Sequence, residues 1–420
     1  MPLSKLQFKP GINREGTNYS NEGGWFNGDK IRFRSGYPES IGGWQRVSNN
    51  QFIGTARKIY DFVTLTSQNL LFIGTEKKTF LENAGTFSDI TPIRSTLSLG
   101  SNPVNTSGGA GSGVITVTTQ TAHGAATGDF VTFASLTTTD GITAAQLNIE
   151  HEITSIPSTT TFTVTTAGSA TSGTTAGGGS SGTAAFQIAI GINTTILGSG
   201  WSAGTWGRFT WGSASGSLSG QTLRLWAADN FGEDLIFNIV DGTIYYWDAT
   251  NGTSTRAVAL TSRTGASDVP VVARKILVSD VDRHCIAFGT NPITSGVQDP
   301  LLIRFSSQES TVDWTPTATN TAGDLRLSKG SEIITAIQTS RQILVWTDQS
   351  LYSMQFIGAP FTFGVSLIGD NTRIAGPNTA IAVNDIVFWM GQENFYIYDG
   401  RIQAIPCTVR DYVFSDMNNQ

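Results

Sequence analysis

The stretch ILVWTDQSLYSMQF, residues 343–356, decides the fold. An apolar run enters a tight polar turn and an aromatic-rich run leads back, a pattern that predicts a β-hairpin. The same pattern returns as IVFWMGQENFYIYDG (386–400), LIFNIVDGTIYYWD (235–248) and LLFIGTEKKTFL (70–81). A repeated hairpin predicts an array of similar small sheets, and a closed array of this kind is a β-propeller.

The spacing of these hairpins gives the expected number of blades. In the second half of the chain they fall near 235–247, 284–305, 343–356 and 386–398, roughly 45 to 55 residues apart, close to the ~40–50 residues of a propeller blade. The hairpin at 70–81 and a further sheet within 186–226 would complete the array. We therefore expect an all-β protein whose propeller has about six blades.

Composition supports this fold class. Charged residues make up 14% of the 420 residues, against ~25% in ordinary globular proteins. The 47 glycines suit many turns, and the 39% of apolar residues with ten tryptophans are enough to fill cores, which argues against disorder. Helix-type periodicity is scarce, and the only candidate is short, around residues 143–149.

One segment differs from the rest of the chain. Residues 101–183 contain no Trp, Tyr, Lys or Arg and are dominated by Thr, Gly, Ser and Ala. Four strand-like runs lie between two Gly-rich edges, 107–113 and 168–182, which read as flexible linkers. We therefore expect a small β-barrel or sandwich at 101–183, inserted between an N-terminal part of the propeller (1–100) and a C-terminal part (184–420).

Charge and hydropathy limit the partners. The net charge is −6 and the pI about 5.1, whereas a protein that binds nucleic acid in a groove is normally basic. The acidic balance fits either ordinary solubility or a passage in which DNA slides without sticking. Residues 1–10 lack the apolar core of a signal peptide, and no run of about 18 apolar residues predicts insertion into a membrane.

No motif predicts catalysis, a metal or a cofactor. The three histidines, His123, His151 and His284, have no partner at a metal-ligand spacing. The adjacent carboxylates Glu233 and Asp234 fit a turn before a strand, because neighbouring residues cannot flank a scissile bond. The expectation is a protein that is not an enzyme.

The tryptophans are the remaining candidates for binding. Aromatic residues at strand ends usually pack between blades, although some can stack on carbohydrate. Trp201, Trp206 and Trp211 recur at five-residue spacing in the Gly-rich stretch 198–212, which predicts a long loop. Exposed aromatic residues in such a loop are typical of protein interfaces, so these three are the candidate interface residues.

Several stretches resemble the tail hub or nozzle proteins of short-tailed bacteriophages, also called packaged-DNA-stabilisation or head-completion proteins. The similarity covers most of the chain outside the Gly-rich edges. Its motifs are Pro10 to Asn13, Gly24-Trp25, Asp29 to Arg34, Gly42 to Trp44, Leu223 to Trp226, Asn230 to Leu235, Ile244 to Asp248, Asp313 to Pro316, Asn320 to Gly323, Val345 to Asp348, Phe388 to Gly391 and Cys407 to Phe414. Residues 123–129 of the insert are similar to a β module of phage virion proteins.

The resemblance implies a structural protein of the virion tail, made in the cytoplasm of the host bacterium. Six copies would form a ring below the portal and its adaptor, in contact with tail fibre or spike proteins. The ring would retain packaged DNA and form the ejection channel, through which double-stranded DNA passes without sequence-specific binding. Members of this family are expected to continue with further strands beyond residue 418.

Two alternatives stay open. A propeller can also bind or cleave glycans, in which case a funnel lined by carboxylates or exposed aromatic residues is expected. The Thr/Gly-rich insert would suit a receptor-binding component of the tail.

Overall fold

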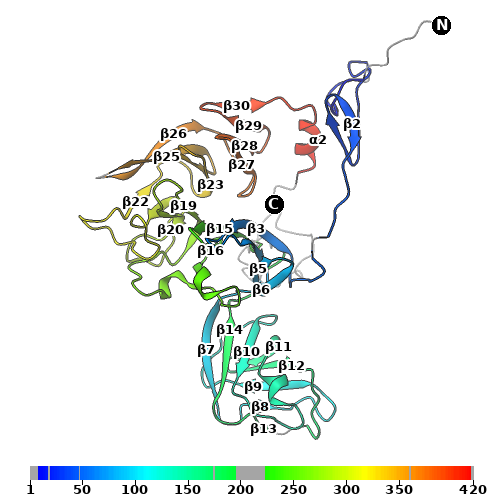
Figure 1. Ribbon diagram of the computed structural model, residues 1–420, viewed down its shortest axis with the longest axis vertical. Coiled ribbons are helices and arrows are strands. Elements are labelled where there is room, and N and C mark those ends of the chain that lie inside the picture. Colours follow the sequence, from blue (N-terminus) through cyan, green and yellow to red (C-terminus); the bar gives the residue numbers. More distant parts are fainter. Residues whose placement is uncertain are drawn as a thin grey trace, which may run out of the picture. The chain divides into compact units, whose positions relative to one another are not determined.

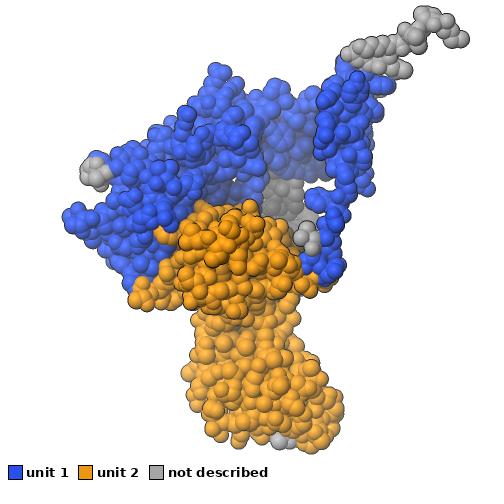
Figure 2. All heavy atoms as spheres, in the orientation of Figure 1, with its two compact units in different colours: residues 1–49, 265–420 blue, residues 50–264 orange. Residues whose placement is uncertain are grey.

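The computed structural model of the chain describes residues 8–17, 19–46, 48–173, 176–194, 223–358 and 361–417. The chain divides into two compact units (Figure 2). Unit 1 comprises residues 1–49 and 265–420, and unit 2 comprises residues 50–264. Described residues of both units form almost only strands and turns (Figure 1).

Unit 1 contains three four-stranded antiparallel sheets, each a blade of the β-propeller. The first blade consists of β19 (Ala273–Val278), β20 (Cys285–Thr290), β21 (Leu302–Phe305) and β22 (Gly323–Arg326). The second consists of β23 (Ile333–Gln338), β24 (Ile343–Thr347), β25 (Ser350–Gly358) and β26 (Thr362–Asp370). The third consists of β27 (Ala380–Val383), β28 (Ile386–Met390), β29 (Phe395–Tyr398) and β30 (Ile402–Ile405).

Unit 2 contains two further blades of the same topology. One consists of β3 (Ala56–Val63), β4 (Asn69–Thr75), β5 (Thr79–Asn83) and β6 (Thr86–Asp89). The other consists of β15 (Trp226–Phe231), β16 (Asp234–Ile239), β17 (Ile244–Trp247) and β18 (Val258–Ala259). Two short 3-10 turns, Ala249–Asn251 and Leu260–Ser262, flank β18.

Neighbouring blades of a unit meet through their first strands. β23 contacts both β19 and β27 in unit 1, and β3 contacts β15 in unit 2. Hydrophobic cores fill the space between adjacent blades, for example around Trp346 and Trp389 in unit 1 and around Phe72 and Phe237 in unit 2. Because the second blade packs against a blade on either side, its middle strand β24 is buried along its whole length.

The predicted hairpins form the second and third strands of the blades. Hydrogen-bonded pairs join β24 to β25, β28 to β29, β16 to β17 and β4 to β5, as predicted. Two of the turns share a device. The buried Thr347 hydroxyl accepts hydrogen bonds from the backbone N–H groups of Gln349 (3.3 Å) and Ser350 (2.9 Å). Thr75 does the same for Lys77 (3.2 Å) and Lys78 (2.8 Å), which fixes both turns locally.

The inserted segment of unit 2 forms a separate eight-stranded sheet with its own core. In sheet order the strands are β13 (Ala176–Gly177), β8 (Val104–Asn105), β9 (Val114–Thr118), β12 (Thr161–Thr165), β11 (Glu150–Ser158), β10 (Phe130–Ala134), β14 (Gly182–Gln187) and β7 (Ile93–Gly100). Strands from both ends of the order supply residues to one core, including Val104 and Phe186. Helix α1 (Ala144–Leu147) lies where the sequence predicts it, capped by the Thr143 hydroxyl.

The described residues hold five blades. The further sheet expected within 186–226 falls largely on residues 195–222, which lie outside the description. Two other expectations about organisation need correction. The inserted sheet runs from Ile93 to Gln187 and so is wider than 101–183.

The Gly-rich edges are the second correction, because they are part of the inserted domain and not linkers. Backbone hydrogen bonds join Gly111 to Ala170 (2.7 Å) and Ala170 to Ser112 (2.8 Å). A Cβ on Gly173 would come within 2.5 Å of the Gly109 backbone, so glycine allows the two segments to pack closely.

The N-terminal arm, residues 8–46 without Asn18, belongs to unit 1 and holds one two-stranded sheet, β1 (Ile31–Arg34) and β2 (Tyr37–Ser40). The part of the arm around Arg14 is held against the C-terminal segment that includes helix α2 (Arg410–Ser415). The backbone of Arg14 donates to Thr408 at 2.9 Å, and its guanidinium lies 3.9 Å from the ring centre of Tyr412. None of the described helices is long and apolar enough to cross a membrane.

Candidate functional site

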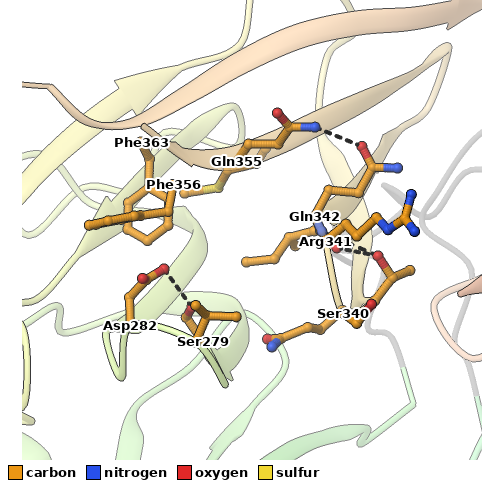
Figure 3. A pocket seen from close by; sticks show the side chains of 13 residues that line it. Ser279, Asp282, Ser340, Arg341, Gln342, Gln355, Phe356 and Phe363 are labelled. Carbon is orange, nitrogen blue, oxygen red and sulfur yellow. Dashed lines mark hydrogen bonds between the residues drawn. The ribbon is translucent and has the colours of Figure 1, made fainter. Parts of the chain in front are cut away.

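A pocket of about 190 Å³ lies in unit 1 where the turn between β19 and β20 faces the second blade (Figure 3). We call it the blade pocket. It is lined by Ser279, Val281, Asp282, the turn 338–343 between β23 and β24, the β25 residues 354–356 and Phe363 of β26. The lining therefore comes from two adjacent blades, and it combines polar turns with an aromatic wall.

The turn between β19 and β20 supplies the one carboxylate of the lining, Asp282. This side chain is buried, with 6% of its surface exposed. It accepts a hydrogen bond from the Ser279 hydroxyl at 3.3 Å, and no ion pair with a described cation is found. The guanidinium of Arg341, across the pocket, extends away from it (Figure 3). Burial raises the pKa of Asp282, and the Ser279 hydrogen bond opposes that rise.

The opposite side of the pocket carries amides and hydroxyls. Gln342 is held by three neighbours: its amide nitrogen donates to the Tyr398 hydroxyl at 3.1 Å, and its carbonyl accepts from Gln355 at 3.2 Å and from the Ser353 hydroxyl. The backbone N–H of Ser340 donates to Asp385, in the third blade, at 2.8 Å. The turn is thus fixed by β25 of its own blade and by the third blade.

Phe356 and Phe363 form the aromatic wall, with ring centres 5.7 Å apart. His284 packs behind them, 5.2 Å from Phe363 and 5.9 Å from Phe356, and its Nε2 lies 3.0 Å from the Thr321 hydroxyl. The His284 ring is fully buried. Burial lowers its pKa to about 4, although a hydrogen bond with the Asp282 backbone acts in the opposite direction.

A pH dependence of stability follows from His284. In the unfolded chain a histidine binds a proton near pH 6.5, whereas the folded chain keeps this ring neutral until about pH 4. Between these values the unfolded state binds more protons, so stability is full above pH 6.5 and falls as the pH drops towards 4. Allowing for screening by solvent, we expect a loss of about 1 kcal/mol between pH 7.5 and 5.

Urea unfolding at the two pH values measures this loss, with His284→Phe as the comparison because it keeps a ring but cannot titrate. The variant should lose less stability on acidification than the natural chain. Equal losses in both would show that His284 does not cause the effect.

A second polar cluster lies in unit 2 at the base of the inserted domain. We call its four members the root cluster: Lys78 and Asp89 of a blade, Arg256 of the other blade and Glu150 of the insert. Lys78 Nζ lies 2.9 Å from Asp89 and also pairs with Glu150, while Arg256 lies 3.2 Å from Asp89 and 3.4 Å from Glu150. Burial alone would raise the pKa of Asp89, but the two cations and its hydrogen bonds hold it below the usual range.

The residues singled out from the sequence coincide only in part with the sites found in the structure. Trp201, Trp206 and Trp211 lie outside the described residues. All three histidines are buried: His123 and His151 pack on the aromatic core of the insert, whereas His284 lies in unit 1. Glu233 and Asp234 lie at the turn between β15 and β16, as predicted for a turn. Within the described residues, no group of three or more His, Cys, Asp or Glu side chains could hold a metal ion. Cys285 and Cys407 are free thiols.

The blade pocket is the site that sequence reasoning missed. Its lining comes from segments around residues 280, 340 and 360, and none of them carries a motif. The one feature of the sequence that could have indicated this pocket is the position of each turn within the repeated blade. Turns at equivalent positions of successive blades lie on the same side of the array, so the turns 279–284 and 339–342 could have been paired.

Comparison with known proteins identifies no family. No protein-family model matches the chain, and no curated protein matches it. Among solved structures, the chain is similar to one described as "Phage phi92 endosialidase", with 11% sequence identity and a TM-score of 0.24; the match covers 86% of this chain and 47% of that one. The chain thus spans about half the length of that protein. A similarity of this size carries no functional argument.

Proposed function

We propose that the chain is a structural subunit of a short-tailed bacteriophage tail, a hub or nozzle subunit placed below the portal and adaptor. Six copies form a ring that retains the packaged DNA and conducts it during ejection. Tail fibre or spike proteins bind to the ring. The proposal assigns the chain no enzymatic activity and no cofactor, and locates it in the virion.

The exposed surface of the N-terminal arm is the observation that carries this proposal. Three aromatic side chains of the arm are almost fully in solvent: Trp44 (104% exposed), Tyr19 (94%) and Tyr37 (77%). Phe8, Phe26 and Ile41 are each at least half exposed as well. Monomeric proteins rarely present so many large apolar side chains along one segment, whereas aromatic residues are enriched in protein interfaces.

The arm also lacks the means to be stable alone. β1 and β2 form an isolated two-stranded sheet, and such hairpins are marginal in water unless a third layer covers them. The covering layer that fits best is a neighbouring copy of the chain. Residues 1–49 contain seven Lys and Arg and four Asp and Glu, which leaves 19 Lys and Arg against 28 Asp and Glu in the remainder. A basic arm is attracted to the acidic body of the next subunit.

The acidic balance suits the passage of DNA. A net charge of −6 repels the phosphate backbone at long range, so DNA that moves through a ring of such subunits is not retained by non-specific binding.

Light scattering and electron microscopy of the purified chain, alone and with the adaptor protein of the same phage, test the proposal. A ring of six subunits is the expected result, with the same chain present in purified particles. A chain that stays monomeric with the adaptor and is absent from particles would overturn it.

Glycan cleavage is less well supported than this structural role. Glycoside hydrolysis normally uses two carboxylates on either side of the scissile bond. Among the described residues, Asp282 is the only acidic side chain that lines the blade pocket. The pocket therefore favours binding over cleavage.

A further inference from the structure

We infer that the blade pocket binds one sugar residue of a glycan, with the Asp282 carboxylate accepting hydrogen bonds from sugar hydroxyls and Phe356 covering the apolar face of the ring. This activity is separate from ring assembly and needs only one copy of the chain.

The size of the pocket limits the ligand. Its volume of about 190 Å³ far exceeds the ~15 Å³ that one water molecule needs, yet lies below the ~300 Å³ at which pockets for drug-sized molecules begin. A single small ring fits this range. A longer glycan would place one residue in the pocket and leave the others in solvent.

The two walls match the two kinds of surface that a sugar presents. Phe356 is 43% exposed although it lies on a strand of a well-packed blade, and buried Met354 and Phe363 adjoin it in the lining. An aromatic side chain left open to a pocket offers a flat surface for the C–H groups of a pyranose ring. His284 supports this wall from behind, so its position does not depend on the ligand.

The polar wall offers both donors and acceptors. Among the described residues, the Asp282 carboxylate has one hydrogen-bond partner, at 3.3 Å, so it can accept further hydrogen bonds from a ligand in the pocket. Ser340, Gln342 and Gln355 lie across the pocket and supply hydroxyl and amide groups (Figure 3). Gln342 already bonds Gln355, and the Ser340 hydroxyl bonds Asp385, but a hydroxyl oxygen can accept further hydrogen bonds and an amide NH2 group has two hydrogens to donate. A ring with several hydroxyls satisfies both sides at once.

Saturation-transfer NMR with free monosaccharides tests the inference. The probes are glucose, galactose, N-acetylglucosamine, rhamnose and N-acetylneuraminic acid, each added to the natural chain. We expect at least one to bind with a Kd of about 1 mM, typical of a small ligand held by a few hydrogen bonds. Asp282→Asn should weaken that binding about tenfold or more, because a hydrogen bond to a charged group is lost.

Two further variants make the outcome decisive. Asp280→Asn changes a neighbouring carboxylate that does not line the pocket, and it should bind like the natural chain. Phe356→Ala removes the half-exposed ring without touching the polar wall, and it should lose binding even if Asp282→Asn fails to fold by circular dichroism. Absence of transfer to all five sugars, or equal binding by the natural chain and both pocket variants, would overturn the inference.

Discussion

Replacing Tyr19, Tyr37 and Trp44 together with serine is expected to abolish assembly of the chain into rings while leaving its blades folded. These are the three most exposed aromatic side chains of the N-terminal arm, so their removal costs the isolated subunit almost no buried surface. In an assembled ring each would be a buried anchor, and such residues contribute about 2 kcal/mol or more apiece. The combined loss corresponds to a decrease of more than ~1,000-fold in the association constant.

A matched control separates the arm from exposed apolar surface in general. Leu65, Val297 and Ile381 are also well exposed, at 84%, 77% and 60%, but they are scattered over different blades. Their triple replacement by serine should leave assembly unchanged, because single exposed apolar residues are ordinary on protein surfaces. Sedimentation velocity reports the size of the assembly, and thermal melting reports the fold. Rings of natural size from the arm variant would refute the role of the arm.

Replacing Lys78 with methionine should destabilise unit 2 by about 3 kcal/mol, because it removes a buried cation from between two carboxylates. The side chain of Lys78 is only 2% exposed, and it binds Asp89, Glu150 and, at 4.3 Å, the ring of Phe130 in the insert. A buried ion pair adds little net stability compared with an apolar pair, but breaking one leaves charges without a partner. Both the blade and the attachment of the insert should weaken.

Lys77→Met is the control, since this neighbour is 31% exposed and pairs with Glu152 at 3.5 Å; its loss should cost less than about 1 kcal/mol. Urea unfolding measures both variants. The pH adds a further check. The lowered pKa of Asp89 stabilises the natural fold above its unfolded value, and this contribution disappears as the pH falls below about 4. The Lys78→Met deficit should shrink there, and a deficit that is constant with pH would contradict the charge explanation.

The parts of the fold that could be predicted from sequence are those set by local interactions. The hairpin at 343–356 can be predicted from its own turn residues, because Thr347 closes the turn through hydrogen bonds to residues two and three positions further on. The helix at 144–147 can be predicted from Thr143 and Gln146, which form a capping box at its N-terminus. Both signals lie within a window of a few residues, where composition and structure are closely linked.

Features that depend on distant partners escaped prediction. The Gly-rich segments 107–113 and 168–182 look like linkers because composition alone does not reveal that they pair with each other. Asp282 and Phe356 are 74 positions apart, and only the stacking of one blade on the next brings them to one pocket. The arm is a different case. Its aromatic residues can be read from the sequence, but only the structure shows that no described part of the chain covers Trp44.

The way in which the insert joins the propeller has a consequence for how such chains evolve. The chain enters the inserted domain along β7 and leaves along β14, and these strands pair directly, with Ile93 opposite Gln187. Paired antiparallel strands keep their ends about 5 Å apart. The points at which the chain leaves and re-enters the blades therefore stay the same, whichever domain is inserted between them. Recombination could exchange the whole module for another of different size without re-selecting the blades. Lineages could therefore diversify this domain rapidly while the propeller that carries it stays constant.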